Sequence, residues 1–220
     1  MNQKLAVSTA ALAATVLTSS ASANVMTYGD SAFDLFDNGL GNLDIVGAAA
    51  SYESGVLSFA VTTRGFSDWT KYMIFVDLAP GVGTTSNAWN RPIDLGTNEI
   101  DFFLGSWVSQ PSDNTQLWAW AGGWFPFGVG SNLVNASTNT VYWSLAVNME
   151  PGDSFRFDVA TSGGGNDPGV DHLSNAGLAT DGWGSPSHAG EFLTFTYVPA
   201  PGALVLLGLA GFLGRPRQRA

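Results

Sequence analysis

Residues 72–76 read YMIFV, an unbroken run of large apolar side chains that ends at Asp77. A strand that is apolar on both faces is buried on both, so this run predicts an inner strand of a sheet. Upstream, Leu57, Phe59 and Val61 alternate with smaller or polar residues. This period of two is typical of a half-buried strand. The two stretches together favour an all-β fold.

The same alternation recurs along the chain, and turn residues interrupt it about every eight to twelve positions, the spacing of an all-β sandwich or barrel. Long runs with the helical period of 3.6 are absent. Further strands are expected at residues 43–50, 100–104, 117–121, 141–147, 155–159 and 193–197. We therefore predict an all-β, antiparallel β-sandwich of jelly-roll type over residues 24–197.

The N-terminal segment differs in composition from this body. Lys4 precedes an Ala-rich apolar run at residues 5–17, and Ala21 and Ala23 supply the small residues of a cleavage site. This is the pattern of a secretory signal peptide. We predict a signal peptide over residues 1–23, removed by signal peptidase.

The C-terminal segment, residues 198–220, joins a Pro-x-Pro motif to an apolar run and a basic end. The run at residues 203–214 carries no charge and would be helical in lipid, although it is short for a membrane span. The motif and the basic end consist of Val198, Pro199, Ala200, Pro201, Gly202, Arg215, Arg217 and Arg219. This arrangement resembles the PEP-CTERM sorting tail of exported bacterial proteins, with Ala200 where that family usually has Glu.

The resemblance implies that an exosortase recognises the tail and delivers the body to the cell surface or the extracellular matrix. The protein would then contact the membrane only through the tail, before processing. An ordinary C-terminal membrane anchor is the alternative.

Charge and composition exclude several partners. Four of the 8 basic residues fall in the two terminal segments, which leaves the body with 4 basic residues against all 18 acidic ones, a net charge of −14. Phosphate binding needs basic clusters, so nucleic acid and anionic lipid are not expected as partners. The chain has no cysteine, so an exported body must rely on core burial.

Several short pieces of the body occur in a recognisable order. They are the Asp- and Asn-rich opening at 37–45, the strand at 55–61, the strand at 72–77 with its terminal Asp, the Gly- and Thr-rich loop at 81–85, and the segments 151–155 and 163–171. In this order they resemble the DOMON-like sandwiches related to family 9 carbohydrate-binding modules. The resemblance implies a β-sandwich that binds a sugar, haem or no ligand yet known, so the fold does not fix the activity.

Tryptophan supplies the candidate ligand-binding residues. Trp118 and Trp120 fall on one face of the strand expected at 117–121, and Trp124 follows a Gly-Gly pair. Exposed indole rings on a strand could stack on sugar rings, so extracellular polysaccharide is a candidate partner. The alternative is that Trp118 and Trp120 face the opposing sheet and fill the core.

Two groups of acidic residues supply candidate metal ligands. Asp34 and Asp37 lie in one loop, and Asp167 and Asp171 lie in another. Carboxylate oxygens suit Ca²⁺, which takes about six to eight oxygen ligands. Neither loop has EF-hand spacing, and Asp residues that cap their own turns are the alternative. We therefore expect no cofactor, and calcium is the one alternative to consider, apart from haem.

Two further hypotheses need a histidine. Haem-binding relatives use axial Met and His, and the body has His172 and His188, but their spacing to any Met supports no pair. Gly29-Asp30-Ser31 resembles the nucleophile block of GDS-type (SGNH) esterases, Gly165-Asn166-Asp167 resembles their Gly-x-Asn-Asp block, and His188 follows. That fold needs β-α-β crossovers, and the Asp that should precede the His is missing. We therefore expect a non-catalytic, surface-sorted sandwich rather than an esterase using Ser31 and His188.

Overall fold

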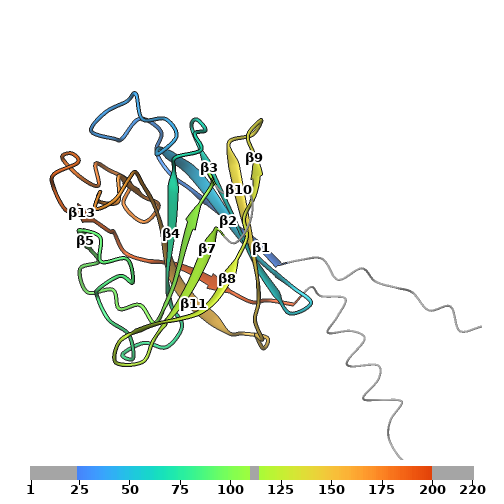
Figure 1. Ribbon diagram of the computed structural model, residues 1–220. Helices are drawn as coiled ribbons and strands as arrows, with labels where there is room; N and C mark the ends of the chain where they lie inside the picture. Colours follow the sequence, from blue (N-terminus) through green and yellow to red (C-terminus); the bar gives the residue numbers. More distant parts are fainter. Residues whose placement is uncertain (1–23, 110–113, 200–220) are drawn as a thin grey trace, which may run out of the picture. The chain divides into compact units, whose positions relative to one another are not determined.

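The computed structural model describes residues 24–109 and 114–199, which form strands and loops without a helix (Figure 1). The first sheet has the strand order β1 (Asn24–Gly29), β2 (Ile45–Glu53), β3 (Val56–Thr63), β10 (Thr140–Ala146) and β9 (Leu133–Asn135). The second has the order β12 (Asp171–His172), β11 (Ser154–Ser162), β4 (Lys71–Asp77), β6 (Phe102–Trp107), β7 (Thr115–Trp120) and β8 (Trp124–Gly130), and β14 (Leu193–Thr196) also pairs with β11. Two short strands, β5 (Ile93–Asp94) and β13 (Ser187–His188), pair in parallel outside these sheets.

The main core lies between the two sheets. Phe59 and Val61 of β3 pack there together with Tyr72 and Ile74 of β4 and Phe157 of β11, all fully or almost fully buried. These are alternate residues of their strands, as the period of two requires. The predicted antiparallel β-sandwich is therefore confirmed.

A second cluster explains why the run at 72–76 is apolar on both faces. Met73 and Phe75 point to the face of the second sheet turned away from the first sheet, which we call the outer face. Residues outside the two large sheets cover part of that face, among them Ile93 of β5 and Phe192 before β14. In Figure 1 the loops with β5 and β13 lie on the side of β4 away from β2. The inner strand is thus buried by a sheet on one side and by loops on the other.

Most predicted strands are present within a few residues of their expected limits. The strands β1, β5, β8, β9, β12 and β13 are not predicted from the pattern. They are short, or they lie at sheet edges where alternation is weak. Pro126 in the edge strand β8 is an example, because proline lacks the N–H group that a central strand would use.

The predicted signal peptide and nearly all of the sorting tail lie outside the described residues. Of the tail, only Val198 and Pro199 are described, and they follow β14. Among the described residues there is no helix long and apolar enough to cross a membrane.

Candidate functional site

Four aspartates gather where the first strands and β12 meet. Asp30 follows β1, Asp34 lies in the β1–β2 loop, Asp44 precedes β2, and Asp171 opens β12. Carboxylate oxygens of Asp34, Asp44 and Asp171 lie within 4.8 Å of one another. Asp30 is close enough to these groups to raise the pKa of Asp171 through its charge. We call these four residues the acidic centre.

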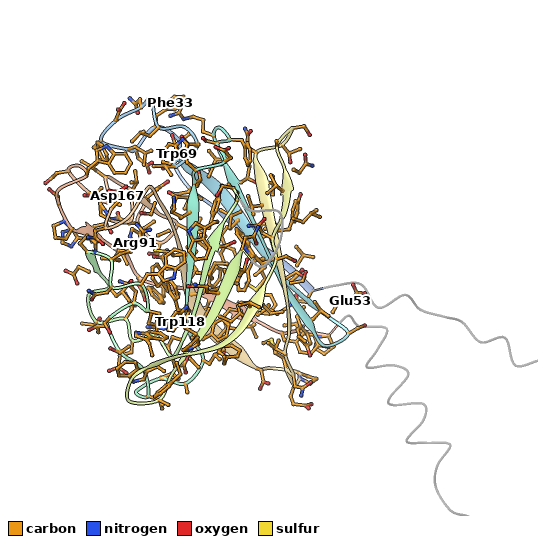
Figure 2. The ribbon with its side chains drawn as sticks, viewed as in Figure 1. Phe33, Glu53, Trp69, Arg91, Trp118 and Asp167 are labelled. Atoms are coloured by element: carbon orange, nitrogen blue, oxygen red, sulfur yellow. The ribbon has the colours of Figure 1, made fainter. Side chains whose placement is uncertain are left out.

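The fold fixes two members of the acidic centre through hydrogen bonds. The carboxylate of Asp171 accepts two backbone N–H groups, that of Ile45 at 2.6 Å and that of the adjacent residue His172 at 2.8 Å. Oδ2 of Asp44 accepts Nε of Arg64 at 2.6 Å and the N–H of Phe33 at 3.1 Å. Phe33 has a φ of 70° and lies in the loop at one end of the sheets (Figure 2).

Other oxygens of the acidic centre are buried and accept no hydrogen bond from another described residue. They are Oδ2 of Asp30, Oδ1 and Oδ2 of Asp34, and Oδ1 of Asp44. Buried polar atoms in proteins almost always have a partner, so each exception needs an explanation.

The environment of the acidic centre raises several pKa values. Burial, and then the negative charge of Asp30, raise the pKa of Asp171 to about 9. Burial is also the main reason why the pKa of Asp30 rises to about 7, with a smaller contribution from Asp34. The pKa of Asp34 is raised by burial and by the charge of Asp44. The protein alone therefore disfavours full ionisation of the centre.

The acidic centre contains only two of the four predicted metal ligands. Asp34 and Asp171 belong to it, whereas Asp37 and Asp167 do not. Oδ1 of Asp37 caps its own turn by accepting the N–H of Gly39 at 2.8 Å. The backbone oxygen of Asp167 accepts Nη1 of Arg91 at 3.0 Å, and the two residues lie close together in Figure 2. Sequence spacing cannot tell which acidic residues of a loop point inward.

The three predicted ligand-binding tryptophans lie on the outer face. Trp118 is paired in register with Phe103 of the second cluster, and Trp120 is paired with Trp124. Trp118 and Trp124 pack against the second cluster, and all three side chains are partly buried. The residue that faces the opposing sheet is Leu117, which packs against the main core. The alternative in which Trp118 and Trp120 fill the core between the sheets is therefore wrong.

A hollow beside these rings contains two other tryptophans. It has a volume of about 370 Å³ and is lined by Lys71, Trp89, Arg91, Trp107, Gln116 and Gly165. The rings of Trp89 and Trp107 lie 4.9 Å apart. Oε1 of Gln116 accepts Nε1 of Trp89 at 2.8 Å and Nε1 of Trp118 at 3.3 Å. This amide links the hollow to the predicted tryptophans.

Two cations line the hollow. Arg64 and Arg156 are paired with Asp44 and Asp77, respectively. Among the described residues Lys71 and Arg91 make no such ion pair, and Nζ of Lys71 donates to the backbone oxygen of Trp69. Both of the body's remaining basic side chains therefore line the same hollow of an acidic protein.

His172 is part of a hydrogen-bonded relay that its sequence context does not suggest. Its Nδ1 lies 2.6 Å from Oδ2 of Asp158, and its Nε2 lies 2.9 Å from Oγ of Ser187. The order Ser–His–Asp is that of a hydrolase triad. All three residues have no solvent exposure, however, so a substrate cannot reach Ser187. The relay holds β13 and β12 against β11.

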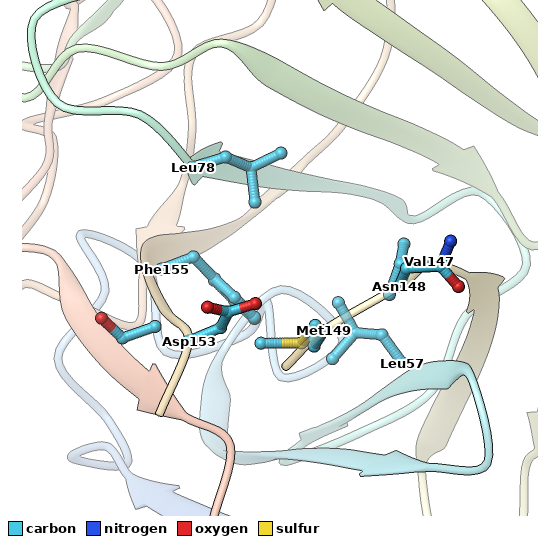
Figure 3. A pocket seen from close by; sticks show the side chains of 8 residues that line it. Leu57, Leu78, Val147, Asn148, Met149, Asp153 and Phe155 are labelled. Atoms are coloured by element: carbon cyan, nitrogen blue, oxygen red, sulfur yellow. The ribbon is translucent and has the colours of Figure 1, made fainter. Parts of the chain in front are cut away.

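The structure gives no geometric support to the histidine-based hypotheses. His188 is exposed and lies 3.2 Å from Asp94, and among the described residues no hydrogen bond joins it to Ser31. Met149 lines an apolar cavity of about 390 Å³ between Leu57 and Phe155 (Figure 3), but none of the residues lining that cavity is a histidine. Both ring nitrogens of His172 already have partners.

Comparison with known proteins gives little further information. No family model matches the chain, and no curated protein matches it. Among solved structures, the chain is similar to one described as "pH-induced modulation of Streptococcus parasanguinis adhesion by Fap1 fimbriae". The likeness covers 82% of this chain and 98% of that chain, with 13% sequence identity and a TM-score of 0.26. A likeness this weak carries no argument about function.

Proposed function

We propose that this protein is an exported, non-catalytic β-sandwich of the cell surface or extracellular matrix that binds a saccharide on its outer face. The observation that carries the proposal is the hollow that Trp89 and Trp107 line together with Gln116 and two basic side chains. Its volume falls within the range of small-ligand sites, about 300–1,000 Å³. Export rests on the two terminal segments of the sequence, and non-catalytic character rests on the burial of the only Ser–His–Asp arrangement among the described residues.

The lining of the hollow suits a sugar. Indole rings offer flat apolar surfaces for the C–H face of a pyranose, and they retain an N–H donor at the edge. Gln116 adds an amide close to those rings, and Lys71 adds a charged donor. This combination of aromatic surface with a few polar groups is typical of sites that orient a ligand.

The two cations indicate which saccharides to test first. Lys71 and Arg91 would attract a carboxylate or sulfate, and opposite charges in a partly enclosed site attract more strongly than in bulk water. We expect a polysaccharide that contains uronic acid or sulfate groups to bind more tightly than a neutral one, and we expect higher salt to weaken that preference.

The test is a titration of the full chain with defined oligosaccharides, neutral and acidic, followed by calorimetry and tryptophan fluorescence. Trp107→Ala should weaken binding at least ~10-fold, because a central aromatic ring in a binding site contributes ~1.4 kcal/mol or more. Tyr142→Ala is the control, since Tyr142 is exposed on β10 of the other sheet.

Two results would contradict the proposal. One is the absence of binding to every oligosaccharide while the protein remains folded. The other is equal loss of binding in both variants, which would place the contact away from the hollow. Export is tested separately, by the N-terminal sequence of the protein recovered outside the cell, which should begin at Asn24.

A further inference from the structure

The acidic centre is unusual because its charges are incompletely balanced. It contains four carboxylates, and its one ion pair with a basic side chain among the described residues is Asp44 with Arg64. Asp30, Asp34 and Asp171 have no positively charged partner there.

The carboxylate oxygens that lack a hydrogen-bond partner indicate that a partner is missing from the acidic centre. The side chain of Asp44 has no solvent exposure, and its Oδ1 accepts no hydrogen bond although its Oδ2 accepts two. Both oxygens of Asp34 are buried as well, without a donor from another described residue. Burying a carboxylate oxygen is costly unless a hydrogen bond or a metal ion compensates for the lost water. No other described residue donates a hydrogen bond to these oxygens, so the lost water is not compensated within the described part of the protein.

We propose that Asp30, Asp34, Asp44 and Asp171 bind a calcium ion. The donors are all carboxylate oxygens, which hard cations such as Ca²⁺ and Mg²⁺ prefer over nitrogen or sulfur donors. An oxygen of each of three of these residues lies within 4.8 Å of the other two. Mg²⁺ usually keeps several waters and is held by only one or two carboxylates, whereas Ca²⁺ accepts about six to eight oxygens, several of them from carboxylates. Four converging carboxylates therefore favour calcium, and waters or backbone oxygens would complete its coordination.

Arg64 limits the number of negative charges that the ion must neutralise. Its Nε holds Oδ2 of Asp44, and its Nη2 donates to the backbone oxygen of Asn38 at 2.6 Å. With this arginine and Ca²⁺ in place, four carboxylates, one guanidinium and one divalent ion sum to a charge of about −1, compared with −3 for the fully ionised centre without the ion. The ion thus removes most of the repulsion at the centre.

The calcium ion would join parts of the chain that are far apart in sequence. Asp30, Asp34 and Asp44 fix both ends of the β1–β2 loop, and Asp171 belongs to β12 at the edge of the other sheet. The ion would therefore fasten the two sheets together at this end. In a chain without cysteine, the ion would cross-link distant segments, as a disulfide does in many exported domains.

Bound protons are the competing explanation, because protonated carboxyls could share hydrogen bonds without a metal. The experiment separates the two explanations with the full chain, first dialysed against a chelator. Calorimetry measures calcium binding, and thermal unfolding is followed with and without Ca²⁺ or Mg²⁺. We expect one calcium per chain and a rise in melting temperature of ~5–10 °C at a hundredfold excess over the dissociation constant.

Asp34→Asn is the most informative variant. Asp34 accepts no hydrogen bond from another described residue through either side-chain oxygen, and asparagine has nearly the same shape. The change should abolish the calcium-dependent rise. In chelator, the variant should melt at the same temperature as the unsubstituted protein or above it, because one repelling charge is gone. If Asp34 had a purely structural role, its substitution would not combine loss of the calcium-dependent rise with an unchanged or higher melting temperature in chelator.

Asp37→Asn is the matched control, because Asp37 lies in the same loop but outside the acidic centre, and it should keep the full calcium response. Asp30→Asn is a second test variant if Asp34→Asn does not fold. The proposal is overturned if calcium neither binds nor raises the melting temperature of the unsubstituted protein, or if the rise persists in the folded test variant. A larger effect of Mg²⁺ than of Ca²⁺ would overturn the assignment to calcium. None of these measurements depends on saccharide binding.

Discussion

Gly105 determines where the ring of Trp89 lies. A methyl group at this position would be 2.1 Å from Cζ2 of Trp89, far inside van der Waals contact. The bare backbone of β6 thus lets the indole lie directly on the sheet, where it reaches Gln116 and forms one wall of the hollow. Gly105 therefore shapes this wall of the hollow although it has no side chain.

Gly105→Ala should therefore displace Trp89 without removing any polar group. We expect a loss of ~1–3 kcal/mol in unfolding free energy from overpacking, together with a changed tryptophan emission spectrum and weaker saccharide binding. Denaturant unfolding and fluorescence measure these effects. Gly130→Ala is the control, because its new methyl group would make only ordinary contacts, at 3.8 Å from Thr115. Equal stability of the two variants would contradict this account of Gly105.

The short strands β12 and β13 depend on buried hydrogen bonds more than on their own ladders. Each has only two residues. The relay from Ser187 through His172 to Asp158 ties both to the long strand β11, and Oδ1 of Asp158 accepts the N–H of Ser174 as well. A polar network that is fully satisfied in a buried site can define a unique arrangement of loops.

Ser187→Ala should leave Nε2 of His172 buried without its partner. Loss of one partner of a buried polar pair costs ~1–3 kcal/mol in unfolding free energy. Ser144→Ala on β10 is the comparison, since its hydroxyl bonds to that of Ser58 in an exposed position and its loss should cost less than ~0.5 kcal/mol. Urea unfolding of both variants measures the difference, and equal midpoints would mean that the relay adds no stability.

The described body has two apolar layers rather than one. The main core fills the space between the sheets, and the second cluster fills the space between the outer face and its covering loops. The β4 strand contributes to both layers with alternate residues. The loops over the outer face are consequently part of the folded core, and they also border the tryptophan-lined hollow.

Removal of a ring from either layer should therefore have a similar cost. Phe75 of the second cluster and Phe59 of the main core are both almost completely buried. We expect Phe75→Ala and Phe59→Ala each to lower the unfolding free energy by ~3–5 kcal/mol in a single cooperative transition. Calorimetry or chemical denaturation tests this. A cost below ~1 kcal/mol for Phe75→Ala would show that the loops cover the sheet only loosely.

The sequence alone determined the fold class and the inner strands of the described body, but not β1, β5, β8, β9, β12 and β13. Alternation at Leu57, Phe59 and Val61 and the doubly apolar run at 72–76 predict the right secondary structure, because the period of two depends only on neighbours along the chain. The same local pattern groups Trp118 with Trp120 on one face. It does not say which face meets the other sheet, since both Leu117 and the tryptophans are apolar.

Tertiary structure alone decided how the sites are assembled. The acidic centre joins Asp34 to Asp171 across 137 positions, and it excludes Asp37, three residues from Asp34. The hollow joins Trp89 from a loop to Trp107 from β6, and neither carries a local signal of binding. Local periodicity fixes which residues share a face of an element, whereas the packing of distant segments fixes which faces and loops meet. Sites built from contacts between distant segments therefore become visible only in the folded chain.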